Sequence, residues 1–459
     1  MGYSAGMAEP GQSADRFWQG LILLGSIPLS VLLLSVAAFW LLTPRVQRLG
    51  DELAAFAEVK TAGRWVRPSH VDRPSPGTLA QALGSLMPEV RRFYAKELAI
   101  EPGGVSSQCW DAALPQRELP SECMASLGRA RPLIRRLQEA SWAEEGGLPE
   151  ELWLFADPNQ PGHDTGQLGL LVLLRLAALE VRLQSGEGHG DAALELCLDG
   201  LALARELGHD GGLLGAMAAE VIHGTLFPPC QEAISRASAA GVHRAIRGLR
   251  RIRESLPPLS SALKSERIFG LLYAFGRLLE PAQQEALPAG MRAFVKQGAE
   301  QMESLPFLSP LLLRIALVEF ERFYEQAFQL VDLPAAVRRP RFQALAEKFN
   351  RSWNPVMHEL PPTLEPYATR VDLQRVQMDL LLAMALAKAH HAEQGGWPSV
   401  LPPLHGGQEV LLPTALELHV LESGALRIAP REEDRRVWEA GLSEEFLEGQ
   451  PPLQVIVSP

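Results

Sequence analysis

A long uncharged segment near the N-terminus constrains this chain more than any other feature. Residues Phe17 to Leu42 contain no charged side chain and consist mainly of Leu, Ile, Val, Ala and Phe. About 20 such residues allow a helix to cross a bilayer, and a helix satisfies its own backbone hydrogen bonds in lipid. Trp18 and Trp40 lie near the two ends, where indole rings favour the headgroup layer. The segment predicts a transmembrane helix over residues 17–43.

A cleaved signal peptide is the alternative for this segment. Ser35-Val36-Ala37-Ala38 supplies small residues of the kind found at a cleavage site. The apolar region is, however, much longer than the ~7–15 residues usual in signal peptides. We therefore expect a retained signal-anchor, preceded by a short tail at residues 1–16.

The charge balance of the chain bears on its partners. Its 459 residues include 43 basic and 54 acidic side chains, so the formal net charge is −11. Nucleic-acid binding needs a concentrated basic surface that displaces counterions from phosphates, and no nucleic-acid partner is expected. The expected partners are the membrane, through residues 17–43, and another protein.

Four cysteines suggest where the body of the chain resides. Cys109 and Cys123 flank a Pro-containing stretch that predicts a loop, and a disulfide between them would contribute ~3 kcal/mol by closing it. Two unrelated free thiols are the alternative. Cys197 and Cys230 fall in apolar helical stretches, where a free Cys acts as a small buried hydrophobe.

The orientation of the anchor follows from two opposing signals. Arg45, Arg48 and Lys60 follow the segment and Arg16 precedes it, which weakly favours a cytoplasmic body. Long domains translocate largely regardless of such charges, and a disulfide requires an oxidising compartment. We expect the body outside the cytoplasm.

Beyond the anchor the pattern is mainly helical. Apolar residues recur at helical spacing over residues 79–98, 170–184, 192–207, 213–237, 242–255, 259–279, 288–302, 308–330, 334–353 and 369–394. Thr78 and Asp191 are expected to cap the first and third of these helices. Consecutive hairpins of this kind predict a helical-repeat-like α-solenoid or an irregular helical bundle. No fixed repeat period is present.

The regions on either side of the helical body differ from it. Residues 44–62 predict an amphipathic stalk, and Pro68, Pro74 and Pro76 predict a linker over 64–77. Near the C-terminus, residues 409–412, 416–421, 425–428 and 453–457 predict short strands, with a turn at Ser423-Gly424 and a helix near 435–440. The expected organisation is a tail at 1–16, a transmembrane helix at 17–43, a stalk and linker at 44–77, a helical body at 78–400 and a small β-hairpin region at 401–459.

The stretch from Leu380 to Leu401 carries the one resemblance to known proteins. Its long Leu- and Ala-rich helix ends in Gly395-Gly396-Trp397-Pro398. Gly395 favours a left-handed cap, Pro398 prevents continuation, and Trp397 is expected to fold back on the helix. This helix-Gly-aromatic-Pro passage resembles one in pilin-like proteins and in uncharacterised bacterial single-pass, membrane-anchored helical proteins. The resemblance implies a bacterial origin and an architecture of anchor, helical body and small β-tail, and it implies no activity.

No catalytic, cofactor-binding or metal-binding residue is assigned. The adjacent His390 and His391 point ~100° apart on a helix and cannot easily bind one ion together. His223, in an apolar helix, predicts a hydrogen-bonded interior side chain. The Gly-rich stretch 186–190 joins two helices and predicts a turn, because a dinucleotide loop needs a preceding strand. No phosphate-loop, zinc-protease or nucleophile-elbow motif is present.

A basic face is the remaining candidate for an interaction surface. Arg244, Arg247 and Arg251 share one side of a predicted helix and could meet an acidic partner or anionic headgroups. An ordinary amphipathic helix with a solvated basic side is the alternative. We therefore predict a membrane-anchored protein-interaction or scaffold module. A membrane-bound hydrolase with an unrecognised site and a self-associating envelope component are the alternatives.

Overall fold

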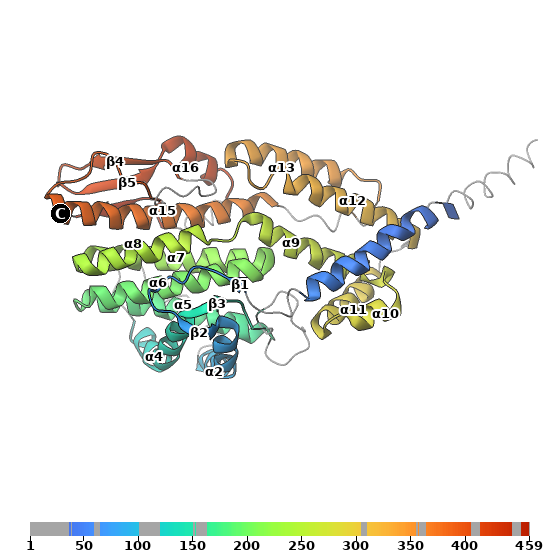
Figure 1. Cartoon of the computed structure of the whole chain (residues 1–459), viewed down its shortest axis with the longest axis horizontal. Coiled ribbons are helices and arrows are strands. Elements are labelled where there is room, and N and C mark those ends of the chain that lie inside the picture. Colours follow the sequence, from blue (N-terminus) through green and yellow to red (C-terminus); the bar gives the residue numbers. More distant parts are fainter. Residues whose placement is uncertain are drawn as a thin grey trace, which may run out of the picture.

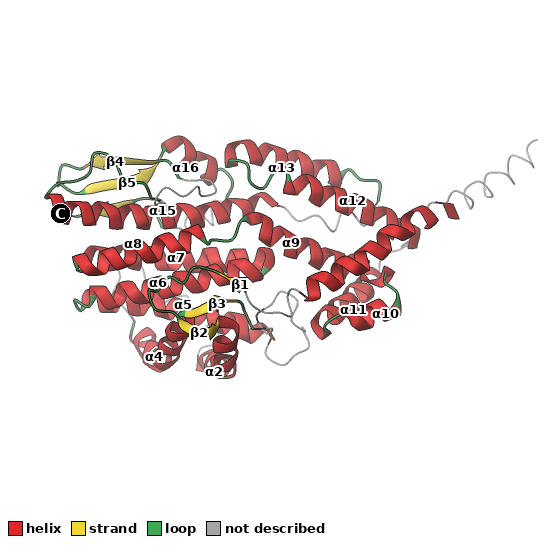
Figure 2. Cartoon of the chain, in the orientation of Figure 1, coloured by secondary structure: helices red, strands yellow, loops and turns green. Residues whose placement is uncertain are grey.

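The structure, a computed structural model, is mainly helical and carries two small sheets (Figure 2). It describes residues 36–37, 39–58, 65–100, 120–149, 152, 163–303, 310–354, 357, 364–404, 414–442 and 451–458. Within these ranges no helix combines the length and the apolarity that a membrane crossing requires. Residues 17–35 of the predicted transmembrane helix lie outside them.

The elements follow the predicted order, with two further helices at residues 121–141 and 281–286 that were not predicted. The first part contains a helix at residues 39–58, hereafter the N-terminal helix, then β1 (Trp65–Val66), β2 (Ser75–Thr78), α2 (Leu79–Ile100), α4 (Ser121–Ser141) and β3 (Ala143–Gly146). The middle part contains α5 (His163–Gly186), α6 (Gly190–Asp210), α7 (Gly212–Arg236), α8 (Ala239–Glu254), α9 (Leu259–Gly270), the π-turn η2 (Leu271–Phe275) and the 3-10 turn η3 (Gly276–Leu278). The last part contains α10 (Pro281–Ala286), α11 (Ala289–Glu303), α12 (Pro310–Phe328), α13 (Ala335–Asn350), α15 (Leu364–Gln394), β4 (Leu416–Val420), β5 (Leu426–Pro430), α16 (Glu432–Glu439) and β6 (Val455–Val457).

The helices enclose two hydrophobic cores. The first core lies among α2, α4, α5, α6, α7 and α8, which stack as successive layers in Figure 1. The second lies among α9, η2, α11, α12 and α13 at the other end of the molecule. Helix α15 runs along both, since Leu364 and Val371 pack in the second core and Val376 to Ala389 in the first. The mainly helical prediction is confirmed.

The N-terminal helix is part of the second core. Its buried residues Val46, Leu49, Leu53 and Ala57 recur every three or four positions and form one apolar face. Arg45 Nη1 lies 2.6 Å from Glu321 Oε2 on α12, and Glu52 pairs with Arg267 on α9. The helix therefore packs against the body, rather than standing clear of it as the predicted stalk would.

The predicted linker is also packed against the body. Trp65–Val66 pairs antiparallel with β3, and Ser75–Thr78 pairs parallel with β3, giving the order β1-β3-β2. Between these strands the side chains of Arg67 and His70 are buried. The linker prediction was wrong because these two polar side chains find buried partners, which composition alone does not reveal.

The second sheet closes the C-terminal end. Strands β4 and β5 pair antiparallel around the predicted turn, where Gly424 has a φ of 80°, and β6 pairs antiparallel with β5. The predicted hairpin and last strand are confirmed, whereas residues 409–412 lie outside the described residues. Gly395 ends α15 with a φ of 72°, and its N–H donates to His391 O at 2.8 Å. Trp397 packs on the His391 ring at a centroid distance of 4.2 Å, so the predicted cap and fold-back are confirmed.

A disulfide joins two neighbouring helices of the first core. Cys197 on α6 and Cys230 on α7 are bonded with their Cα atoms 5.7 Å apart, and both residues are buried. The expectation that they are free thiols was wrong, because spacing in sequence does not show that the two helices pack side by side. Cys123 is also disulfide-bonded and buried. Cys109 lies outside the described residues, so the Cys109–Cys123 pairing stays a prediction.

A glycine contact in the second core gives the first test of this packing. A Cβ added to Gly298 on α11 would lie 1.8 Å from the carbonyl oxygen of Tyr273 in η2. Gly298→Ala should therefore lower the free energy of unfolding by about 2–3 kcal/mol, as overpacking of a core does. The measurement is urea denaturation of the full chain followed by circular dichroism.

Gly128→Ala is the matched control. Gly128 lies in the interior of α4, is exposed, and has nothing within 4 Å of the added methyl. Alanine is a better helix former than glycine, so this variant should gain ~0.5–1 kcal/mol. Equal stability of the two variants would mean that α11 and η2 do not approach as described.

Candidate functional site

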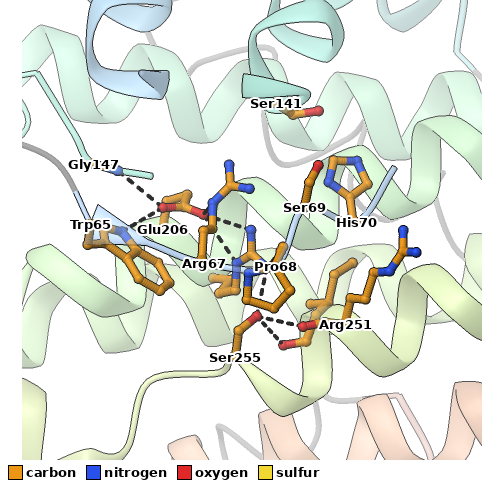
Figure 3. Close-up of polar contacts among 12 residues, drawn as sticks. Trp65, Arg67, Pro68, Ser69, His70, Ser141, Gly147, Glu206, Arg251 and Ser255 are labelled. Atoms are coloured by element: carbon orange, nitrogen blue, oxygen red, sulfur yellow. Dashed lines mark hydrogen bonds and ion pairs between the residues drawn. The ribbon is translucent and has the colours of Figure 1, made fainter. Parts of the chain in front are cut away.

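A buried polar cluster lies between α6 and the segment that follows the N-terminal helix (Figure 3). We define the α6 polar cluster as Trp65, Arg67, His70, Asp199, Arg205 and Glu206. Asp199 and Glu206 stand seven positions apart on α6, so the helical repeat places both carboxylates on one face about 10 Å apart. Residues 65–70 cross this face and supply the groups that neutralise it.

Glu206 is the centre of one half of the cluster. Its Oε1 lies 2.6 Å from Arg67 Nε and 2.9 Å from Arg205 Nη2. Its Oε2 accepts a hydrogen bond from Trp65 Nε1 at 3.0 Å. All three charged side chains are at most 1% exposed. One buried carboxylate therefore pairs with two buried guanidinium groups.

Arg205 also ties α6 to the next helix. Its Nη1 donates to Ser255 Oγ at 2.7 Å, just beyond α8, and approaches Pro68 O at 3.3 Å. Burial lowers the pKa of Arg205 to about 10, against the opposing effect of Glu206. The group therefore remains charged at neutral pH.

Asp199 is the centre of the other half. Its Oδ1 accepts from His70 Nε2 at 2.7 Å and from Trp142 Nε1 at 2.8 Å, and Ser141 Oγ lies 3.0 Å from the same oxygen. The side chains of His70 and Asp199 are 0% and 3% exposed. Three donors from two separate segments thus converge on one carboxylate oxygen.

This arrangement does not form a nucleophilic site. A serine hydrolase needs the hydroxyl on one ring nitrogen of the histidine and the carboxylate on the other. Here Ser141 and His70 both bind the same Asp199 oxygen, and all three groups are buried away from substrate. The α6 polar cluster is therefore a clamp that holds residues 65–70 against α6.

Two further buried ion pairs fix α15. Arg253 on α8 contacts both oxygens of Asp379, at 2.8 and 3.2 Å, and Thr414 Oγ1 donates to Asp379 Oδ2 at 2.7 Å. Arg338 on α13 binds Asp372 Oδ2 at 2.6 Å. Asp372 and Asp379 stand seven positions apart on one face of α15, and they attach the helix to α13 and to α8.

The predicted basic face is occupied by acidic groups of the same chain. Asp72 accepts from Arg247 at 2.8 Å and from Arg251 at 3.0 Å, and the Arg247 hydrogen bond lowers the pKa of the Asp72 carboxyl. Arg244 lies 3.3 Å from Asp191 on α6. The three arginines lie on one face as expected, and that face attaches α8 to residue 72 and to α6.

The prediction that Asp191 caps α6 is wrong, since the N-cap residue of this helix is His189. The Asp191 carboxylate accepts from the backbone N and the Oγ of Ser238, both at 2.7 Å. It therefore stabilises the start of α8, whose N-cap is Ser238. At the start of α2 the prediction is confirmed, since Gln81 N donates to Thr78 Oγ1 at 3.2 Å.

The predicted histidine environments differ in outcome. His223 on α7 is buried, but neither ring nitrogen has a hydrogen-bond partner, so the expected hydrogen bond is wrong. Burial lowers its pKa to about 3, which keeps the ring neutral. His209 stacks on Trp65 with ring centroids 4.0 Å apart. Within the described ranges no group of three metal-binding side chains comes together.

The inter-core cavity is a second candidate site. It occupies about 380 Å³ where the two cores meet. Leu171 and Leu207 line it from the first core, and Phe269, Phe294 and Tyr367 line it from the second. Among its described lining residues, one side chain is acidic: the carboxyl of Glu266 on α9. Burial raises the pKa of this carboxyl, although it accepts a hydrogen bond from Leu213 N.

The sequence interpretation missed both sites. Asp199, Arg205 and Glu206 were detectable as charges on one face of an otherwise apolar helix, but their partners at 65–70 lie about 130 positions earlier. Glu266 had no local signal, because most of its apolar surroundings come from other segments: Leu152 and the helices α5, α6, α7, α11 and α15. No protein-family model, no curated protein and no solved structure matches this chain.

Glu206→Gln tests the clamp. The amide keeps the shape of the side chain but leaves Arg67 and Arg205 without a neutralising charge, which should cost about 3–5 kcal/mol of unfolding free energy. Urea denaturation measures the loss. The matched control is Glu195→Gln on the same helix, where the carboxylate is 56% exposed in its pair with Arg244 and should matter by less than ~1 kcal/mol. Similar losses for both would contradict the clamp.

Proposed function

We propose that this chain is a single-pass, membrane-anchored helical scaffold that binds another protein at the bacterial envelope, with its body in the periplasm. The observation that carries the proposal is that the apolar stretch is continuous in sequence with a helix of the packed body. The uncharged stretch Phe17–Leu42 runs directly into the N-terminal helix, and that helix is packed into the second core. In this proposal the anchor is followed in sequence by a helix that is itself part of the second core.

The described end of the N-terminal helix supports a membrane location. Phe39, Trp40 and Leu41 are 40%, 70% and 77% exposed, and the helix projects from the body at this end (Figure 1). Adjacent exposed apolar side chains are costly in water but suit the interfacial layer of a bilayer. Arg314 on α12 lies with its guanidinium 3.8 Å from the Phe39 ring centroid. Such a pair, apolar ring and basic group, suits a headgroup boundary.

The Cys197–Cys230 disulfide supports the orientation. Disulfides persist in oxidising compartments such as the periplasm and are rare in the cytosol. This bond joins helices α6 and α7 inside the first core. It therefore supports a body outside the cytoplasm independently of the Cys109–Cys123 prediction.

The internal use of charge supports a scaffold over the hydrolase alternative. The α6 polar cluster and the Asp379 pair are buried and engaged in holding segments together. An array of long helices with its polar chemistry directed inward leaves outer surfaces for protein partners. The basic face around Arg247 is less favoured as the contact surface, because Asp72 already occupies it.

Membrane anchoring is tested by placing charges in the apolar segment. The double variant Leu24→Arg, Leu33→Arg should no longer be retained, because each arginine at a helix centre costs about 2.5–3.5 kcal/mol on insertion. The readout is resistance of the full chain to alkaline extraction from bacterial membranes. Leu24→Ala, Leu33→Ala is the matched control and should remain in the pellet. Release of the unaltered chain by alkali would overturn the proposal.

The side of the membrane is tested with one new thiol. Lys296 on α11 is 80% exposed, so Lys296→Cys should react with a membrane-impermeant maleimide in intact spheroplasts. The described native cysteines are buried in disulfides and give little background. The unsubstituted chain is the control. If the Lys296→Cys variant reacted only after lysis, the body would lie in the cytoplasm.

A further inference from the structure

The inter-core cavity has the composition of a ligand site. Its volume of about 380 Å³ falls within the 300–1,000 Å³ range typical of small-molecule pockets. At ~30 Å³ per water-sized volume, it would hold on the order of a dozen non-hydrogen atoms. Well-packed protein interiors contain few spaces of this size.

Aromatic rings form one side of the cavity. Phe269 on α9 and Phe294 on α11 meet edge to face with centroids 5.1 Å apart, and Tyr367 on α15 lines the same space. Tyr273 stacks behind Phe269 at 5.8 Å and supports it. Ring faces attract cations through their quadrupole, and ammonium ligands are commonly bound in such surroundings.

The single carboxyl makes the preference for a cation stronger. Glu266 accepts one hydrogen bond, from Leu213 N, and a carboxylate has acceptor capacity for more. No basic side chain is among the described residues that line the cavity. The neighbouring Lys264 and Arg267 face a different hollow, beside the N-terminal helix. An ammonium group would thus meet a carboxylate without competition from a lining cation.

We propose that the inter-core cavity binds a small lipophilic ammonium compound, with its apolar part against the leucines and its cationic group between Glu266 and the aromatic rings. An anionic group next to the ammonium would face Glu266 across an apolar wall, so zwitterionic headgroups fit poorly. Binding would offset the energy that burial costs the carboxylate, which is consistent with the raised pKa of Glu266.

The test compares probes that differ only in the head group. The full chain in lipid nanodiscs is titrated with n-octylammonium and with n-octanol, using calorimetry with empty nanodiscs as the blank. We expect octylammonium to bind at least about 10-fold more tightly, since a charge-assisted contact and a cation–π contact are added. Octylammonium binding no tighter than octanol would overturn the proposal.

Two variants locate the binding. Glu266→Gln keeps an acceptor for Leu213 N–H but removes the charge, so octylammonium affinity should fall to that of octanol while octanol affinity stays unchanged. Ala218→Phe fills the cavity from α7 and should weaken both probes. Glu300→Gln removes an exposed carboxylate, 66% accessible on α11, and should leave both affinities unchanged. Unchanged octylammonium binding by Glu266→Gln would assign the site elsewhere. This result would not bear on membrane anchoring.

Discussion

Charge burial along α6 is the constraint on which the first half of the structure depends. A helix that carries Asp199, Arg205 and Glu206 toward a hydrophobic core is stable only if each charge finds a partner. Arg205 and Glu206 pair with each other, and Arg67 and His70 from residues 65–70 pack across the helix as further partners of Glu206 and Asp199. The short sheet β1-β3-β2 then forms because Trp65 and its neighbours are already held beside β3. The pairing of buried polar groups, and not strand propensity, explains why a two-residue strand forms in a helical protein.

The same reasoning explains how the predicted membrane segment is connected. The N-terminal helix completes the second core through its apolar face, and residues 65–78 complete the first through buried polar contacts. These two packed segments follow one another directly after the apolar stretch. Under the proposed anchoring, any displacement of the membrane helix would be transmitted to both cores. A scaffold benefits from this, because its binding surface keeps a fixed position relative to the bilayer.

The sequence allowed prediction of those elements whose signal lies in a short stretch of consecutive residues. The helical spacing of apolar residues placed the ten predicted helices, and Ser423-Gly424 placed the hairpin, because both signals lie within one element. Several of the wrong predictions involved contacts between distant segments. The prolines at 68, 74 and 76 suggested a linker, but Arg67 and His70 make it part of the body. Cys197 and Cys230 suggested core hydrophobes, but α6 and α7 bring them together.

The inter-core cavity lies beside the turn that joins α6 to α7. Gly212 adopts a φ of 62°, and a Cβ on Gly215 would lie 2.3 Å from the carbonyl oxygen of Leu207. Only glycine allows so close an approach of backbone to backbone. Gly211 and Gly215 line the cavity here together with Leu213 and Leu214. The same connection directs Leu213 N–H toward Glu266. One tight connection therefore forms part of the cavity wall and supplies a backbone donor to the carboxyl that lines it.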